Sequence, residues 1–246
     1  MATSTLTVGL LVSLAATGLG LAVAAKGAPP EPAAPPAIAF AAASIRLERN
    51  LTDTDGEAVI TVRAGDQPLK DLSVVGPDQR TVLELAAPGR LGAGELVFET
   101  AEPAFNELLN AYPAGRYHFT GHDTAGRELS SYATVSQAFI RAPLITYPAN
   151  GSIHVTTSKL IVHWNPVPGA TGYVVELEAD KAGLATTIDI PRNVTAFAPP
   201  DGWLLPGDSY TLGVGSVAAS GNRTVTEIRF TTVEKAPATS GASARP

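Results

Sequence analysis

Hydrophobic and polar residues alternate along many short stretches of this chain, and turn formers separate these stretches. An alternation with a period of two residues is typical of β-strands that bury one face. In the amino-terminal half, the pattern predicts strands at residues 44–48, 58–63, 69–75, 80–85, 95–100, 116–120 and 128–136. Residues 76–79 and 123–126 carry the Pro, Asp and Gly that turns use, so they predict two hairpins.

One stretch of this half departs from the two-residue period. Phe105, Leu108, Leu109 and Tyr112 have the i, i+3, i+4, i+7 spacing that buries one face of a helix, and Pro103 can open it. We expect one short helix that covers an end of a β-sandwich.

The carboxyl-terminal half shows a tighter alternation. Leu160, Val162 and Trp164 alternate with His163, so the indole is expected inside and the imidazole outside. Further strands are expected from Tyr210 and around residues 227–230. The strand over residues 173–178 should have one buried and one solvent-exposed face. The buried face should carry Tyr173, Val175 and Leu177, and the exposed face should carry Val174, Glu176 and Glu178.

Three motifs in this half, Leu160–Pro166, Ala170–Leu177 and Leu205–Val214, together resemble strands B, C and F of a fibronectin type III domain. The resemblance spans residues 142–233. It implies that Trp164 is a core residue and that Tyr210 is a tyrosine corner, whose hydroxyl binds backbone a few residues upstream.

A weaker resemblance covers residues 113–126, which are similar to the last hairpin of bacterial Ig-like modules. The expected fold class is therefore all-β: two tandem β-sandwiches, Ig-like and fibronectin type III-like, of which the first holds one short helix. They are expected at residues 38–141 and 142–233.

The two ends of the chain have a different composition. Residues 1–25 carry no charged side chain and are largely apolar, which is typical of an export signal. About twenty helical residues also span roughly 30 Å, the thickness of a bilayer core, so both a cleaved signal peptide and a retained membrane anchor fit. Residues 26–37 are a Pro/Ala-rich linker, and residues 234–246 read as a disordered tail.

Charge and cysteine content narrow the class of protein. The formal net charge of -6 argues against nucleic acid as a partner. The chain has no cysteine, which excludes disulfides, thiolate metal sites and a cysteine nucleophile, and mildly favours a bacterial source for an exported protein. No motif indicates a cofactor or a phosphate-binding loop.

Two groups of residues have the chemistry of metal ligands. His118 and His122 flank a predicted hairpin, but strand residues four apart lie about 13 Å from each other, so we predict surface residues rather than a metal site. Asp53, Asp55 and Glu57 have the opening rhythm of a calcium loop without its later ligands, and a hairpin turn explains them as well.

Other side chains are candidates for sugar chemistry. Glutamates 95, 99, 102 and 107 would form a glycosidase pair only if two faced one cleft, and alternation instead places Glu95 and Glu99 on an exposed face. Trp203 and Tyr117 are candidate rings for stacking on a pyranose, although Trp203 would equally cover one end of the core. The candidate ligand contacts are thus Trp203, Tyr117, His118 and His122.

These observations favour a non-enzymatic protein. We expect an exported binding or spacer module of the cell envelope, which is periplasmic, secreted or anchored by its N-terminal segment and contacts a protein or glycan there. The alternative is a carbohydrate-binding accessory module, for which Trp203 or Tyr117 should be exposed.

Overall fold

The computed structural model describes residues 36–87 and 92–233. The predicted export segment, residues 26–35 of the linker and the predicted tail lie outside the described residues. In the described ranges, no helix is both long and apolar enough to cross a membrane.

The strands form where the alternation predicts them. The first half contains β1 (Ala42–Asn50), β2 (Gly56–Arg63), β3 (Leu69–Val75), β4 (Thr81–Ala86), β5 (Glu95–Glu99), α1 (Phe105–Ala111), β6 (Gly115–Asp123) and β7 (Glu128–Val135). The second half contains β8 (Ile145–Tyr147), β9 (Ser152–Val155), β10 (Val162–Trp164), β11 (Gly172–Ala179), β12 (Ala185–Pro191), β13 (Ala196–Phe197), β14 (Ser209–Val217) and β15 (Arg223–Thr232). The seven strands predicted in the first half are confirmed, and β1 and β6 each extend four residues beyond their predicted bounds.

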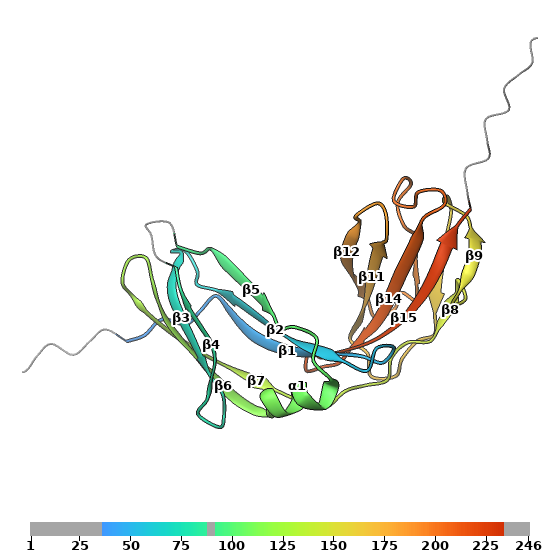
Figure 1. Cartoon of the computed structure of the whole chain (residues 1–246). Helices are drawn as coiled ribbons and strands as arrows, with labels where there is room; N and C mark the ends of the chain where they lie inside the picture. The colour runs from blue at the N-terminus through green and yellow to red at the C-terminus, as the bar shows by residue number, and fades with distance from the viewer. Residues whose placement is uncertain (1–35, 88–91, 234–246) are drawn as a thin grey trace, which may run out of the picture. The chain divides into compact units, whose positions relative to one another are not determined.

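The strands form two β-sandwiches (Figure 1). In the first sandwich, the layer of β1, β2 and β5 faces the sheet with order β4-β3-β6-β7. In the second, the layer of β12, β11, β14, β15 and β9 faces the sheet with order β13-β10-β8. β1 also pairs in parallel with β15, so one eight-stranded sheet runs through both sandwiches. The expected fold class, all-β with sandwiches, is confirmed.

Each sandwich has its own hydrophobic core. Leu47, Ile60 and Phe119 belong to the first core, and Trp164 and Phe230 belong to the second. Burial of such side chains stabilises a fold by about 1.5 to 3 kcal/mol each. The inward positions of Trp164 and Phe230 agree with the alternation of their strands.

Helix α1 packs on strand β2. Its Leu108 is buried, and a Cβ placed on Gly56 of β2 would lie only 3.1 Å from Leu108 and 3.2 Å from Phe105. The absence of a side chain at Gly56 therefore lets the helix approach the strand. The predicted helical spacing is confirmed, since Tyr112 is buried as well.

Tyrosine hydroxyls bind backbone at the ends of both sandwiches. The hydroxyl of Tyr210 accepts a hydrogen bond from the Leu205 N–H at 2.7 Å and lies 3.4 Å from the Trp203 carbonyl, as the tyrosine-corner resemblance implies. In the first sandwich, Tyr117 donates to the carbonyl of Pro113 at 3.0 Å. These bonds satisfy backbone groups just before the chain enters β6 and β14.

The prediction for Val174 is wrong. It was expected on the wet face of its strand, yet its relative exposure is 0%. A Cβ built on neighbouring Gly215 would lie 2.6 Å from Val174 and 3.0 Å from Val225, so the valines pack over a glycine that has no side chain. Val225 also pairs with Asn50 of β1, which makes this outer face part of an internal contact.

Candidate functional site

The two sandwiches meet at a junction built on backbone pairing, defined here by residues 46–57 of the first sandwich and 217–227 of the second. Along β1 and β15, Glu48, Arg49 and Asn50 stand opposite Arg223, Thr224 and Val225. The N–H of Leu51 then donates to the carbonyl of Val225 at 2.9 Å. The junction is therefore a continuation of the sheet.

The side chain of Asn222 ties both sandwiches together. It is 2% exposed, and its oxygen accepts from the Leu47 N–H at 3.1 Å. Its amide nitrogen donates to the carbonyls of Ser136 at 2.7 Å and Ala138 at 3.2 Å. One buried amide of the second sandwich thus binds backbone of strand β1 and of the segment after β7, both in the first sandwich. Two domains joined only by a linker would not need this contact.

A second set of hydrogen bonds lies further along β15. The Asn50 amide donates to the Glu227 carboxylate at 2.8 Å, and the Glu227 N–H donates to the Thr52 hydroxyl at 2.8 Å. The loop between β1 and β2 therefore contacts the second sandwich through both side chain and backbone of Glu227.

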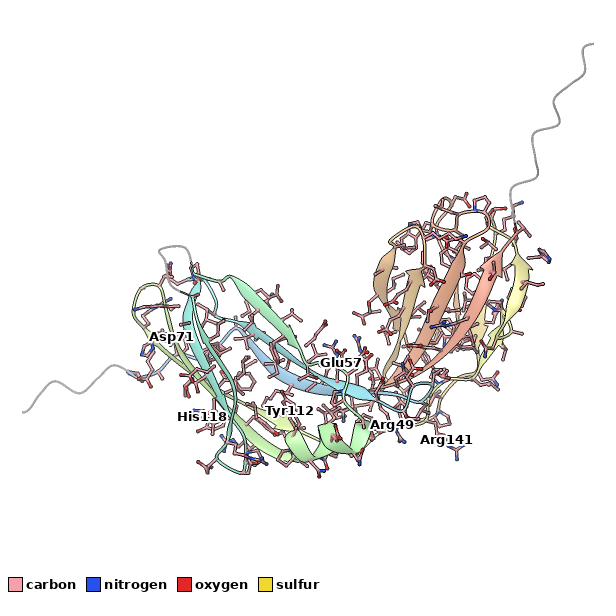
Figure 2. The ribbon with its side chains drawn as sticks, in the orientation of Figure 1. Arg49, Glu57, Asp71, Tyr112, His118 and Arg141 are labelled. Carbon is pink, nitrogen blue, oxygen red and sulfur yellow. The ribbon has the colours of Figure 1, made fainter. Side chains whose placement is uncertain are left out.

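A pocket of about 430 Å³, called here the junction pocket, lies beside the paired strands and is lined mainly by charged side chains. Its lining consists of Arg46, Glu48, Glu57, Glu99, Glu102, Glu176, Glu178, Ala185, Thr186, Thr187 and Arg223. Figure 2 shows Glu57 on strand β2 of the first sandwich. Six glutamates and two arginines leave four negative charges without a partner when every group is ionised. No aromatic ring is among these lining residues.

Arg223 is the central cation of this pocket. Its guanidinium lies 3.5 Å from Glu48, 4.0 Å from Glu176 and 3.3 Å from Asp189. Its side chain is 13% exposed, against 12% for Glu48 and 26% for Glu176. A buried guanidinium shared by carboxylates of both sandwiches makes each of these charges depend on the junction.

Burial changes the proton affinity of several glutamates. It raises the pKa of Glu57 to about 7, and the carboxylates of Glu48 and Glu99 act in the same direction. Burial also raises the pKa of Glu176 to about 7, assisted by Glu48 and opposed by Arg223. Two carboxyl groups from different sandwiches therefore change their protonation state near neutral pH.

Two charged groups of the pocket have incomplete partners within the described residues. Glu48 Oε2 and Arg46 Nε are buried and form no hydrogen bond there. Burial raises the pKa of Glu48 against the opposing effects of Arg223 and Arg46. Burial lowers the pKa of Arg46, and the charge of Arg223 adds to this. Keeping these buried groups ionised therefore carries a desolvation free-energy cost.

The pocket gathers part of the glutamate set that the sequence singled out. Glu99 and Glu102 line it, whereas Glu95 and Glu107 are not among its lining residues. Glu95 and Glu99 are exposed, as their alternation predicted. A carboxylic acid with a raised pKa beside ionised carboxylates is one component of glycoside hydrolysis, but this lining offers no ring on which a sugar would stack.

The loop with calcium-like rhythm is a hairpin turn between β1 and β2. The side-chain oxygen of Asn50 accepts from the Thr52 N–H at 2.9 Å, which shapes the turn. Asp55 and Glu57 line a smaller pocket of about 100 Å³ beside the main one. Within the described residues, no group of three or more His, Asp or Glu is arranged to hold a metal ion.

His118 and His122 lie on unbroken strand β6, and Figure 2 shows His118 with Asp71 on this sheet. His118 bonds the Ser130 hydroxyl at 2.9 Å and stacks on Tyr132 with ring centroids 4.4 Å apart. His122 bonds the carboxylate of Asp71 at 2.9 Å. Each imidazole therefore has its own neighbour, and the structure does not bring the two together.

The carbohydrate-binding alternative requires an exposed Trp203 or Tyr117, and Tyr117 is buried. Its relative exposure is 0%, because its ring belongs to the first core while its hydroxyl binds the backbone. Trp203 is half-buried and packs against the second core, with its ring centroid 6.5 Å from that of Phe197. Trp203 thus covers one end of the second core, beside Tyr210.

The pocket itself was missed by sequence reasoning. Glu48, Glu176 and Arg223 were read as residues of separate strands, if at all. The one signal was the length of β1 beyond its apolar core residues, since Glu48 to Asn50 continue the strand into a polar sequence. That signal does not reveal which strand would pair with it.

Comparisons with known proteins add context for the fold. No family model matches the chain, and no curated protein matches it. Similar solved structures include the FN1-FN3 domains of chicken CNTN1, with 15% identity, a TM-score of 0.31, and coverage of 82% of this chain and 67% of that chain. The neighbours are fibronectin type III structures.

Two further structures belong to the same group. A two-domain fibronectin type-III segment from chicken tenascin has 12% identity and a TM-score of 0.31, and the match covers 73% of this chain and 94% of that one. Fibronectin(III)-like modules of Clostridium thermocellum CbhA have 9% identity and a TM-score of 0.32, with coverage of 79% and 93%. At this level of similarity, the description of the fold rests on the strands and sheets above.

Proposed function

We propose that this chain is a non-catalytic spacer and binding module of the cell envelope, in which the junction couples two β-sandwiches into one mechanical unit. The observation that carries the proposal is the buried Asn222 side chain of the second sandwich, which binds backbone of the first sandwich at Leu47 and Ser136 in addition to the β1–β15 pairing. A spacer of fixed geometry needs such a contact, because domains joined only by a linker move independently.

The export part of the proposal rests on the apolar, uncharged residues 1–25 and the Pro-rich residues that follow them. Fractionation of the source cells should recover the native protein from the envelope or the medium. Recovery from the cytoplasm alone would contradict it. The mass of the mature N-terminus then distinguishes a cleaved signal from a retained anchor.

Spin-label distance measurements on the full chain test the spacer function. The chain contains no cysteine, so Lys70→Cys and Ile153→Cys would place one label on an exposed position of each sandwich. We expect a single narrow distance distribution at pH 6. Asn222→Ala should broaden it, whereas Asn193→Ala, in an exposed turn of the second sandwich, should leave it unchanged. A distribution that is already broad in the parent protein would overturn the proposed function.

A carbohydrate-binding role receives less support. It required an exposed Trp203 or Tyr117, and Tyr117 is fully buried while Trp203 is partly covered by the second core. Titration of the full chain with a panel of glycans, followed by tryptophan fluorescence, tests what remains of this role. Quenching that Trp203→Phe abolishes would restore it.

A further inference from the structure

Both sides of the junction pocket carry excess negative charge. The first sandwich contributes four glutamates and one arginine, namely Arg46, Glu48, Glu57, Glu99 and Glu102. The second contributes two glutamates and one arginine, namely Glu176, Glu178 and Arg223. When all these groups are ionised, the two faces repel each other, and the shared contacts of Arg223 are the opposing attraction.

The repulsion acts on a contact that is otherwise short. The backbone pairing between β1 and β15 comprises three residue pairs. The buried Asn222 amide and the Asn50–Glu227 hydrogen bond complete it. A contact of this size is sensitive to a change of one or two charges in its low-dielectric surroundings.

We infer that the junction is a proton-sensitive contact, which holds the sandwiches firmly while its glutamates are protonated and loosens when they ionise. This inference rests on the proposed spacer function. It makes the rigidity of the spacer depend on the acidity of its surroundings.

The groups that face the two central carboxyls come from every neighbouring strand. Glu57 on β2 is faced by Arg46 and Glu48 on β1, Glu99 on β5 and Glu102 beyond it. Glu176 on β11 is faced by Glu48, Glu57, and Arg223 and Glu227 on β15. The remaining charges are Glu178 on β11, Asp189 on β12, and Asp53 and Asp55 in the β1–β2 loop. Anions outnumber cations around both carboxyls, so ionisation of either one adds repulsion.

The direction of the effect follows from the protonation states. The pKa of Glu57 and that of Glu176 are both about 7, so both groups are largely neutral at pH 6 and largely ionised at pH 8. The junction should therefore tighten as the pH falls from 8 to 6. Glu48 pairs with Arg223, so protonation of Glu48 would remove part of the attraction that opposes the repulsion.

The spin-labelled full chain tests this inference. With labels at positions 70 and 153, the distance distribution should be narrow at pH 6 and broad at pH 8.5. The double variant Glu57→Gln and Glu176→Gln should keep the distribution narrow across this range. The matched control, Glu84→Gln with Glu128→Gln, removes two exposed carboxylates from another sheet of the first sandwich and should behave like the parent.

The outcomes separate the two proposals. A distribution that stays narrow at every pH overturns the proton-sensitive junction and leaves the spacer function standing. A distribution that is broad even at pH 6 overturns the spacer function itself. Broadening that survives in the Glu57→Gln, Glu176→Gln variant, or disappears equally in the control, assigns the pH response to other groups and overturns the inference.

Discussion

Two regions of the molecule collect acidic residues, and they differ in burial. At the junction, Glu48 and Arg223 have side chains only 12% and 13% exposed. On the outer face of β3, β4, β6 and β7, the pair formed by Asp71 and His122 is 39% and 51% exposed. Similar residue types thus occupy dry and wet surroundings, and only the dry set holds glutamates whose pKa is raised to about 7.

Solvent access, rather than the number of charges, therefore determines how strongly an acidic cluster affects the free energy of unfolding. Exposed ion pairs contribute about 0 to 1 kcal/mol, whereas loss of one partner of a buried pair costs about 3 to 5 kcal/mol. The junction should therefore respond strongly to changes that the outer face tolerates.

The largest effect is expected from Arg223→Met. The variant leaves Glu48 and Glu176 without their guanidinium, so the free energy of unfolding at pH 7 should fall by about 3 kcal/mol. The loss should be smaller at pH 5, where the carboxyls gain protons. Urea unfolding of the full chain measures both values. Arg229→Met on the same strand is the control, since Arg229 is exposed; an equal loss in both variants would refute the special role of Arg223.

Tyr210→Phe separates burial from charge. It removes the hydroxyl that accepts from the Leu205 N–H in the second sandwich, so the free energy of unfolding should fall by about 1 to 3 kcal/mol. Because the tyrosine stays neutral, this loss should be the same at pH 6 and pH 8. Thermal or urea unfolding at both pH values checks it. A strongly pH-dependent loss would contradict the distinction between a buried neutral hydroxyl and the buried ionisable carboxyls.

The buried carboxyls of Glu57 and Glu176 should also make the free energy of unfolding depend on pH. Between pH 4.5 and about 7, Glu57 and Glu176 keep protons in the folded chain that they release in the unfolded chain. The free energy of unfolding should therefore decrease as the pH rises through this window, and these groups add no further change above it. Their double replacement by Gln should flatten the curve in urea unfolding. A curve that is equally steep in the variant would contradict the assignment.

The smallest effect is expected on the outer face. His122→Ala removes the exposed contact with Asp71, and the free energy of unfolding should change by no more than about 0.5 kcal/mol. The same unfolding assay applies. A loss as large as that of Arg223→Met would show that exposure does not determine how much a charged pair contributes to the free energy of unfolding.

Most of the fold could be predicted because it depends on local patterns. Alternation located the strands of the first sandwich, helical spacing located α1, and the motif around Tyr210 indicated a corner that the structure contains. Tyr117 was a candidate ligand contact and is buried, because alternation defines two faces of a strand without telling which one is covered. The prediction for Val174 failed for the same reason, since its face is covered by packing over Gly215 beside Val225.

The candidate site could not be predicted from sequence. Glu48 and Arg223 are 175 positions apart, and only the pairing of β1 with β15 makes them neighbours. Their chemistry depends on burial produced by that pairing. The sequence analysis named Glu99 and Glu102 among four candidate glutamates but could not indicate that Glu57 and Glu176 would be their neighbours.

The parallel direction of β1 and β15 has a mechanical consequence. When one strand of a parallel pair is pulled by its amino end and the other by its carboxyl end, the load acts along the strands and strains their hydrogen bonds together. Tension between residue 42 at the start of β1 and residue 232 at the end of β15 would reach the three junction pairs in this shearing direction. This short parallel pairing is thereby oriented to resist stretching between those two positions.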